Sequence, residues 1–109
     1  MHRTAKLLTF AVILLAGLIV GCDTNAEREL RRAEKALDDA MAVNADAYAT
    51  EDYNEAEAAF DEAQQLAKDN RIQEARTAAI KAKLSAEDAR RKAEERKAIL
   101  ESEMDRLGK

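Results

Sequence analysis

The sequence predicts an all-α fold, either an antiparallel helical hairpin or a three-helix bundle with a long C-terminal helix. Three observations support this prediction. Charged residues make up 37% of the 109-residue chain and aromatic residues only 4%, a composition typical of long helices. Neither proline nor glycine lies between Cys22 and Leu107. Alanine and larger apolar residues recur there at spacings of three and four, which places them on one face of a helix.

The N-terminal segment has the pattern of an export signal. Basic side chains at positions 3 and 6 precede an apolar run over residues 7–20. A single membrane span needs about 20 apolar residues, so this run is short for a permanent span and suits a cleaved signal. The alternative is a membrane helix that ends in a structural cysteine. We expect residues 1–21 to be removed and residues 22–109 to form one small helical domain.

The tetrapeptide Ile19-Val20-Gly21-Cys22 resembles the lipobox of bacterial lipoproteins. The resemblance implies that the Cys22 thiol receives a diacylglycerol, that the bond between Gly21 and Cys22 is then cut, and that the new amine is acylated in many such proteins. Two or more acyl chains anchor a protein stably, so the expected partner is the membrane. The expected location is the bacterial cell envelope, on its periplasmic side or the outer side of the cytoplasmic membrane.

Asp23 follows the lipidation site directly. In enteric bacteria an aspartate there resembles the signal that retains lipoproteins in the inner membrane. Because this rule varies among bacteria, inner and outer membrane both stay open. Cys22 is also the only cysteine, so no intrachain disulfide can form.

A first helix is predicted to begin at Thr24. Thr24 and Glu27 have the spacing of a capping box, in which each side chain accepts a hydrogen bond from the other residue's amide. One apolar stripe follows along this helix. Its members are Leu30, Ala33, Leu37, Ala40 or Met41, Asn44, and Ala47 or Tyr48.

A bend is predicted between residues 44 and 52, with Thr50 as the cap of a second helix that runs to about residue 68. The next break between helices is predicted at Asp69 and Asn70, where Asn70 and Gln73 have the spacing of a weaker capping box. The inward positions of this second helix are Tyr53, Ala56, Phe60, Ala63, and Leu66 or Ala67. Because every break lacks proline and glycine, fusion of the helices into one rod is the alternative.

A third helix is predicted from about residue 71 to Leu107, with Gly108 as its stop. Large residues mark where the core is expected, whereas the last 15 or so residues should project or pair with another chain. The stripe of this helix is Ile72, Ala75, Ala79, Ala82, Ala86, Ala89 and Ala93, then Leu100, Met104 and Leu107. The large residues expected in the core are Leu30, Leu37, Met41, Tyr53, Phe60, Leu66, Ile72 and Leu84.

Residues 45–93 resemble an uncharacterised family of alanine-rich helical bacterial lipoproteins. The resemblance rests on Ala47-Tyr48-Ala49-Thr50-Glu51, followed by an aromatic at Tyr53, Glu55-Ala56 and Phe60. Thr50 stands where the family favours proline, so the helix start is less firmly set. The resemblance implies an envelope location, sometimes alongside peptidoglycan-binding domains, and implies no chemistry.

The chain ends in Lys109, and murein lipoprotein also ends in a lysine, which is joined to peptidoglycan. By that resemblance Lys109 is a candidate link to peptidoglycan. The ending Arg106-Leu107-Gly108-Lys109 lacks the aromatic residue and arginine that precede the terminal lysine of murein lipoprotein. The alternative is an ordinary cation at a helix C-terminus, where the helix dipole favours positive charge.

The mature chain offers no parts for catalysis or for a metal site. It would contain no histidine, no thiol free of lipid, and only Ser85 and Ser102 as serines. We therefore expect no catalytic residue, no metal and no cofactor. Removal of the signal leaves a net charge of −6, which disfavours nucleic acid as a partner.

The predicted function is a non-enzymatic structural or adaptor role at the membrane, with an envelope protein or peptidoglycan as partner. One alternative is a helical module that binds a protein or peptide through Tyr48, Tyr53 and Phe60, although such aromatics are more often core. Another is a peptidoglycan-linked spacer through Lys109. A homo-oligomer joined by alanine stripes also stays open.

Overall fold

The computed structural model describes residues 24–108 and shows four α-helices in this range, without strands. The helices are α2 (Thr24–Ala42), α3 (Ala45–Tyr48), α4 (Thr50–Lys68) and α5 (Ile72–Leu107). The all-α prediction and the long C-terminal helix are confirmed, and the helices before and after residue 70 are separate. No helix within these residues combines the length and apolar character needed to cross a bilayer.

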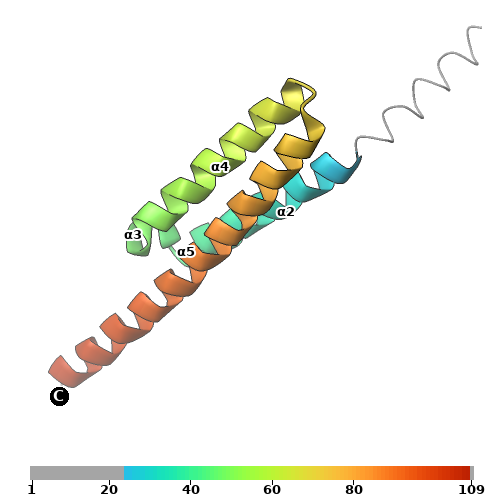
Figure 1. Ribbon diagram of the computed structural model, residues 1–109. Coiled ribbons are helices and arrows are strands. Elements are labelled where there is room, and N and C mark those ends of the chain that lie inside the picture. Colours follow the sequence, from blue (N-terminus) through green and yellow to red (C-terminus); the bar gives the residue numbers. More distant parts are fainter. Residues whose placement is uncertain (1–23, 109) are drawn as a thin grey trace, which may run out of the picture.

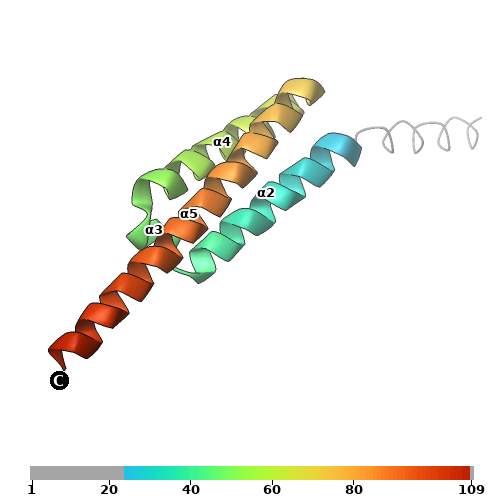
Figure 2. The ribbon, with the colours of Figure 1, turned by 60° about the horizontal axis from the view of Figure 1, so that its bottom comes forward.

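Helices α2, α4 and α5 lie side by side as a three-helix bundle (Figures 1 and 2). Core contacts give their directions. Leu30, Ala33 and Ala40 contact progressively later residues of α5, so α2 and α5 run the same way. Ala63 packs with Ala79 and Ala56 with Ala89, so α4 runs the opposite way. Helix α5 packs extensively on both neighbours, whereas α2 and α4 touch each other far less.

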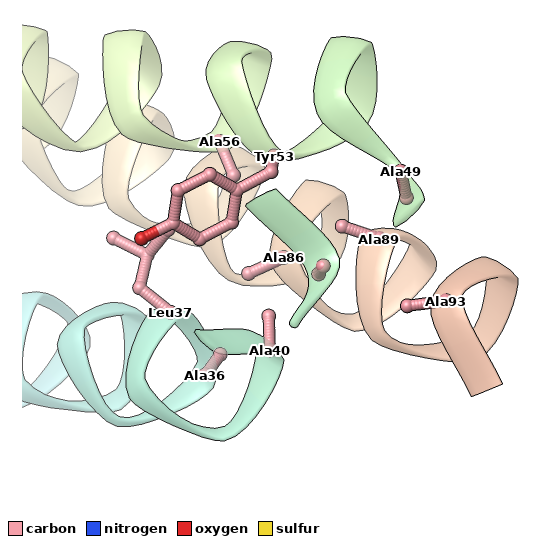
Figure 3. Close-up of a cluster of buried hydrophobic side chains, with 10 residues drawn as sticks. Ala36, Leu37, Ala40, Ala49, Tyr53, Ala56, Ala86, Ala89 and Ala93 are labelled. Atoms are coloured by element: carbon pink, nitrogen blue, oxygen red, sulfur yellow. The ribbon is translucent and has the colours of Figure 1, made fainter. Parts of the chain in front are cut away.

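Alanine forms almost the whole core. Among residues 26–108, Leu37 and Tyr53 are the only buried residues larger than alanine, and no large side chain in this range is fully enclosed. The alanine stripe predicted for the last helix, from Ala75 to Ala93, is buried throughout. Figure 3 shows the Tyr53 ring between α4 and α2, among alanines contributed by all three long helices. Small side chains let helix axes approach closely, which compensates for the small apolar area that each one buries.

Two large residues expected in the core are exposed instead. Met41 is 46% exposed and Leu84 is 55% exposed. Leu84 lies two residues from both Ala82 and Ala86, about 200° around the helix from each. Since both alanines face the bundle, Leu84 must face outward. Met41 follows the buried Ala40 by one residue and is turned about 100° away from it.

Two of the three predicted helix caps, those at Thr50 and Asn70, are wrong, because each of these residues serves the preceding helix. Asn70 has a left-handed φ of 62°, and the Arg71 amide donates to the Leu66 carbonyl at 2.9 Å. With the Asn70 amide on the Ala67 carbonyl, these bonds form a Schellman motif that ends α4. The Thr50 hydroxyl donates to the Asp46 carbonyl at 2.9 Å, and Ala49 is the N-cap of α4.

The bend predicted near residue 44 is present. Asn44 adopts a φ of 59°, the left-handed conformation that asparagine tolerates better than most residues. The short α3 follows, and Ala49 then separates it from α4. This double break reverses the chain within a few residues, so that α4 can return along α5.

Helix α5 continues beyond the rest of the bundle (Figure 1). Every residue from 98 to 107 is exposed, as expected for a projecting end. Gly108 is the C-cap of the helix, with its amide donating to the Met104 carbonyl at 2.9 Å. The free end of α5 lies at the opposite end of the molecule from the start of α2.

Candidate binding surfaces

The first candidate surface is the free end of α5, defined by Leu100, Met104 and Leu107. These side chains are 44%, 71% and 86% exposed. Their spacing of four and three places them on one helical face, and Leu100 follows the buried Ala93 by seven residues. The face that packs in the bundle therefore continues past it, with larger apolar side chains and no covering helix among the described residues.

A clamp between α3 and α5 marks where the free end begins. The Arg96 guanidinium donates to the Tyr48 carbonyl, and the Lys97 ammonium lies 5.9 Å from the centre of the Tyr48 ring. Nearby, the Lys92 ammonium and the Asp52 carboxylate form a 2.9 Å ion pair that joins α5 to α4. These contacts hold α5 up to about residue 97, so the residues after it form a free helical extension.

The second candidate surface is a cleft of about 310 Å³ between α2 and α4, which we call the acidic cleft. It exists because these two helices each pack on α5 more closely than on each other. Its apolar floor and its carboxylate walls come from both helices. The lining residues are Glu34, Leu37, Asp38, Tyr53, Glu57, Phe60 and Asp61.

Tyr53 connects the core to the acidic cleft. Its side chain is 6% exposed, yet no group of the described residues hydrogen-bonds its hydroxyl. Because no polar side-chain atom in this part of the chain is both enclosed and unpaired, the hydroxyl must open into the cleft that Tyr53 lines. Burial raises the pKa of this hydroxyl, and the charges of Glu57, Asp46 and Asp38 raise the pKa further.

The four carboxylates of the acidic cleft have no cationic partner among residues 26–108. Some carboxylates elsewhere on α2 and α5 do have one: Lys35 pairs with Asp39 at 3.1 Å and Arg90 with Glu94 at 3.1 Å. Helix α4 contains no basic residue before Lys68, so it supplies none to the cleft. The cleft is therefore a concentration of uncompensated negative charge over an apolar floor.

The structure brings the three predicted surface aromatics together, mostly inside the molecule. Tyr53 is buried, and Tyr48 and Phe60 are half-buried against the same core cluster. This placement supports the interpretation of these aromatics as core, with the edges of Tyr53 and Phe60 lining the acidic cleft. Gly21, Cys22, Asp23 and Lys109 lie outside the described residues, as does the side chain of Thr24 in the predicted capping box.

Sequence reasoning missed the acidic cleft. It considered carboxylates that are adjacent in sequence, and these do point apart: Asp38 lines the cleft, whereas Asp39 pairs with Lys35 outside it. The cleft could have been predicted from the i,i+4 spacing of Glu34 with Asp38 and of Glu57 with Asp61. This spacing places each pair on one helical face, next to the apolar stripe of its helix. Within residues 24–108, no three histidine, cysteine or acidic residues are placed to hold a metal ion.

Comparison with known proteins adds no relative: no protein-family model, no curated protein and no solved structure matches this chain. The resemblance to alanine-rich lipoproteins stays a prediction.

Proposed function

We propose that the protein is a non-enzymatic adaptor lipoprotein of the bacterial envelope, held at a membrane by the lipid on Cys22. The observation that carries the proposal is the free end of α5, which presents Leu100, Met104 and Leu107 beyond the bundle. In this role the bundle holds the free end of α5 in a fixed direction. The apolar face of this free end contacts a helical segment of an envelope partner.

The direction of the helices supports this proposal. Helix α2 is described from Thr24, two residues after the proposed lipidation site, so the anchored end of the bundle is the start of α2. Since α2 and α5 run the same way, the free end of α5 points away from that anchor (Figure 1). A 36-residue helix is about 54 Å long, which sets the reach from the membrane.

The chemistry of the extension suits helix pairing. Apolar side chains at i, i+4 and i+7 are the anchors by which an amphipathic helix is recognised in a groove or beside another helix. Charged residues surround them, which keeps the free extension soluble and sets the partner's orientation. An alternative function, the peptidoglycan-linked spacer through Lys109, uses the same direction of α5, because Lys109 follows the residue that ends the helix.

The test is site-specific crosslinking of the lipid-anchored protein in cells. A photoreactive residue replaces Met104 in one variant and Leu84 in a matched control, which is also exposed on α5 but faces out from the bundle. We expect discrete crosslinked partners at 104 only, and their loss when Cys22→Ser releases the chain from the membrane. Equal products at both positions, or none at 104, would refute the adaptor role. Muropeptides that carry a Lys109 fragment would instead establish the spacer.

A further inference from the structure

We propose that one end of the bundle binds the anionic headgroups of the membrane and that this contact holds the bundle upright. We call this part the anchor end and define it as residues 26–32 and 62–82, which comprise the start of α2, the end of α4 and the first part of α5. The proposal rests on the lipid anchor of the proposed function. It concerns the end of the molecule that lies opposite the free end of α5.

Core contacts place the starts of α2 and α5 at the same level. Ala33 packs with Ala82, so each α5 residue lies level with the α2 residue 49 positions earlier (82 − 33), and the neighbouring cluster keeps this offset. Gln73 therefore lies level with Thr24, where α2 begins. Figures 1 and 2 show the turn between α4 and α5 at this end of the bundle. A lipid two residues before Thr24 would thus bring the whole anchor end to the membrane surface.

Exposed basic side chains without an acidic partner gather at the anchor end. Six lysine or arginine residues among the described ones neither form an ion pair nor contact Tyr48, and five of the six lie here. Arg32 and Arg71 are the paired bases of this end. The five unpaired bases are Arg28, Arg31, Lys68, Arg76 and Lys81, all exposed, and the sixth is Arg106 at the free end of α5. The anchor end therefore presents positive charge that is available to an external anion.

Net charge also divides along the length of the bundle. Residues 26–32 and 62–82 contain seven basic and five acidic residues, a net charge of +2. Residues 33–61 and 83–108 contain eight basic and 16 acidic residues, a net charge of −8. Asp23 lowers the first sum by one and leaves the contrast in place. A negatively charged membrane surface therefore attracts the anchor end and repels the rest of the molecule, and both effects favour an upright bundle.

Three of the unpaired bases lie within reach of the headgroups. Arg28 and Arg76 lie within about one helical turn of the level of Thr24, that is about 6 Å. Lys68 is in the last turn of α4, beside the turn at this end. Long aliphatic stems let these side chains extend their charge to a phosphate, and a guanidinium can bind a phosphate through two parallel hydrogen bonds. Salt limits the attraction to about 8–10 Å, so bases at this level act on the membrane and those farther along the bundle do not.

Energy transfer to the membrane measures how the bundle stands. Cys22 is the only cysteine and carries the lipid, so Gln73→Cys or Ser102→Cys adds a single free thiol for a donor fluorophore at an exposed position of α5. The lipid-bearing mature protein is reconstituted into phosphatidylcholine vesicles, with or without phosphatidylglycerol, that contain an acceptor dye on a lipid headgroup. In an upright bundle the heights of the two positions differ by about 44 Å, the rise of 29 residues (102 − 73), whereas in a flat bundle they are equal.

We expect phosphatidylglycerol to turn the bundle upright. Energy transfer from position 102 should fall about twofold, and transfer from position 73 should not fall, because the anchor end stays at the surface. Added salt should reverse the change, since it screens the attraction between the bases and the headgroups.

Two sets of three substitutions separate this contact from an effect of net charge. The anchor-end set removes three unpaired bases and should abolish the response to phosphatidylglycerol. The control set removes three exposed bases that form ion pairs outside the anchor end, and it should respond as the parent protein does. The anchor-end set is Arg28→Gln, Lys68→Gln and Arg76→Gln. The control set is Lys35→Gln, Arg90→Gln and Arg91→Gln. Circular dichroism verifies that both sets keep the helical bundle.

Three results would overturn the headgroup contact. The first is the same heights of positions 73 and 102 on both kinds of vesicle. The second is a response that the anchor-end set keeps or that both sets lose equally. The third is a response that salt does not weaken. Mature protein whose mass shows no lipid on Cys22 would refute the anchor and with it the proposed function. A lipid-bearing protein without a response refutes the headgroup contact alone, because the adaptor role is tested by crosslinking at position 104 in cells.

Discussion

Replacement of Ala82 by leucine tests whether alanine is what allows these three helices to pack. Ala82 is fully buried on α5 and packs with Ala33 of α2 and Ala59 of α4. All three helices therefore meet around this residue through methyl groups. A leucine adds three carbon atoms at a point where the facing side chains are already the smallest that have a Cβ.

The expected cost follows from the packing. Overpacking of a close-packed core costs about 1–3 kcal/mol, because neighbours must leave their rotamers or the backbone must move. Apart from Phe60, which packs against this cluster, the neighbours are alanines that have no rotamers to change, so a leucine there should push the helices apart. A domain of this size has a free energy of unfolding of roughly 4–13 kcal/mol, at about 0.05–0.15 kcal/mol per residue. The substitution should therefore remove a substantial fraction of the stability.

The assay is thermal unfolding of the mature protein, followed by circular dichroism. At about 4–8 °C per kcal/mol, Ala82→Leu should lower Tm by about 4–24 °C. Ala98→Leu is the matched control, since Ala98 is exposed on the free part of the same helix. Its effect should stay within about 0.5 kcal/mol. A Tm that rises in Ala82→Leu, or an equal fall in both variants, would show that the helices are not packed closely through their alanines.

Three further predictions concern single residues. Tyr53→Ala should cost about 3–5 kcal/mol of unfolding free energy in a denaturant titration, whereas Tyr53→Phe should change it little because the hydroxyl has no protein partner. Asn70→Val should cost about 1–2 kcal/mol in the same assay because φ is 62° there, and Asn70→Gly should be tolerated. The raised pKa of Tyr53 implies stability that is fully present below pH 10 and lost as pH rises through the folded-state pKa. Tyr53→Phe should remove that part of the pH dependence, and an unchanged alkaline slope would contradict it.

The buried face of α5 could be predicted from residue spacing alone. The alanines from Ala75 to Ala93 repeat with the period of a helix, and the structure buries all of them. The projecting end was also predictable, because few large apolar residues follow Ala93. Both features depend only on which residues share a helical face, and that information is local in sequence.

Helix boundaries were harder to assign, for a physical reason visible at Asn70 and Thr50. A polar residue between two helices can end the first or begin the second, and the same side chain suits both roles. At Asn70 the backbone adopts the left-handed conformation that closes α4, so the residue cannot also cap α5. The choice depends on the angle at which the two helices meet, which their packing sets.

The candidate sites divide in the same way. The sequence by itself determined that this chain forms alanine-faced helices with a long, partly unsupported last one. It also contained each carboxylate of the acidic cleft at helical spacing beside an apolar stripe. Only the tertiary structure decided that α5 packs between α2 and α4 and that those two helices stay partly apart. That Asp38 and Glu57 line one cleft depends on this arrangement, because the two residues lie on different helices, and helical periodicity describes one helix at a time.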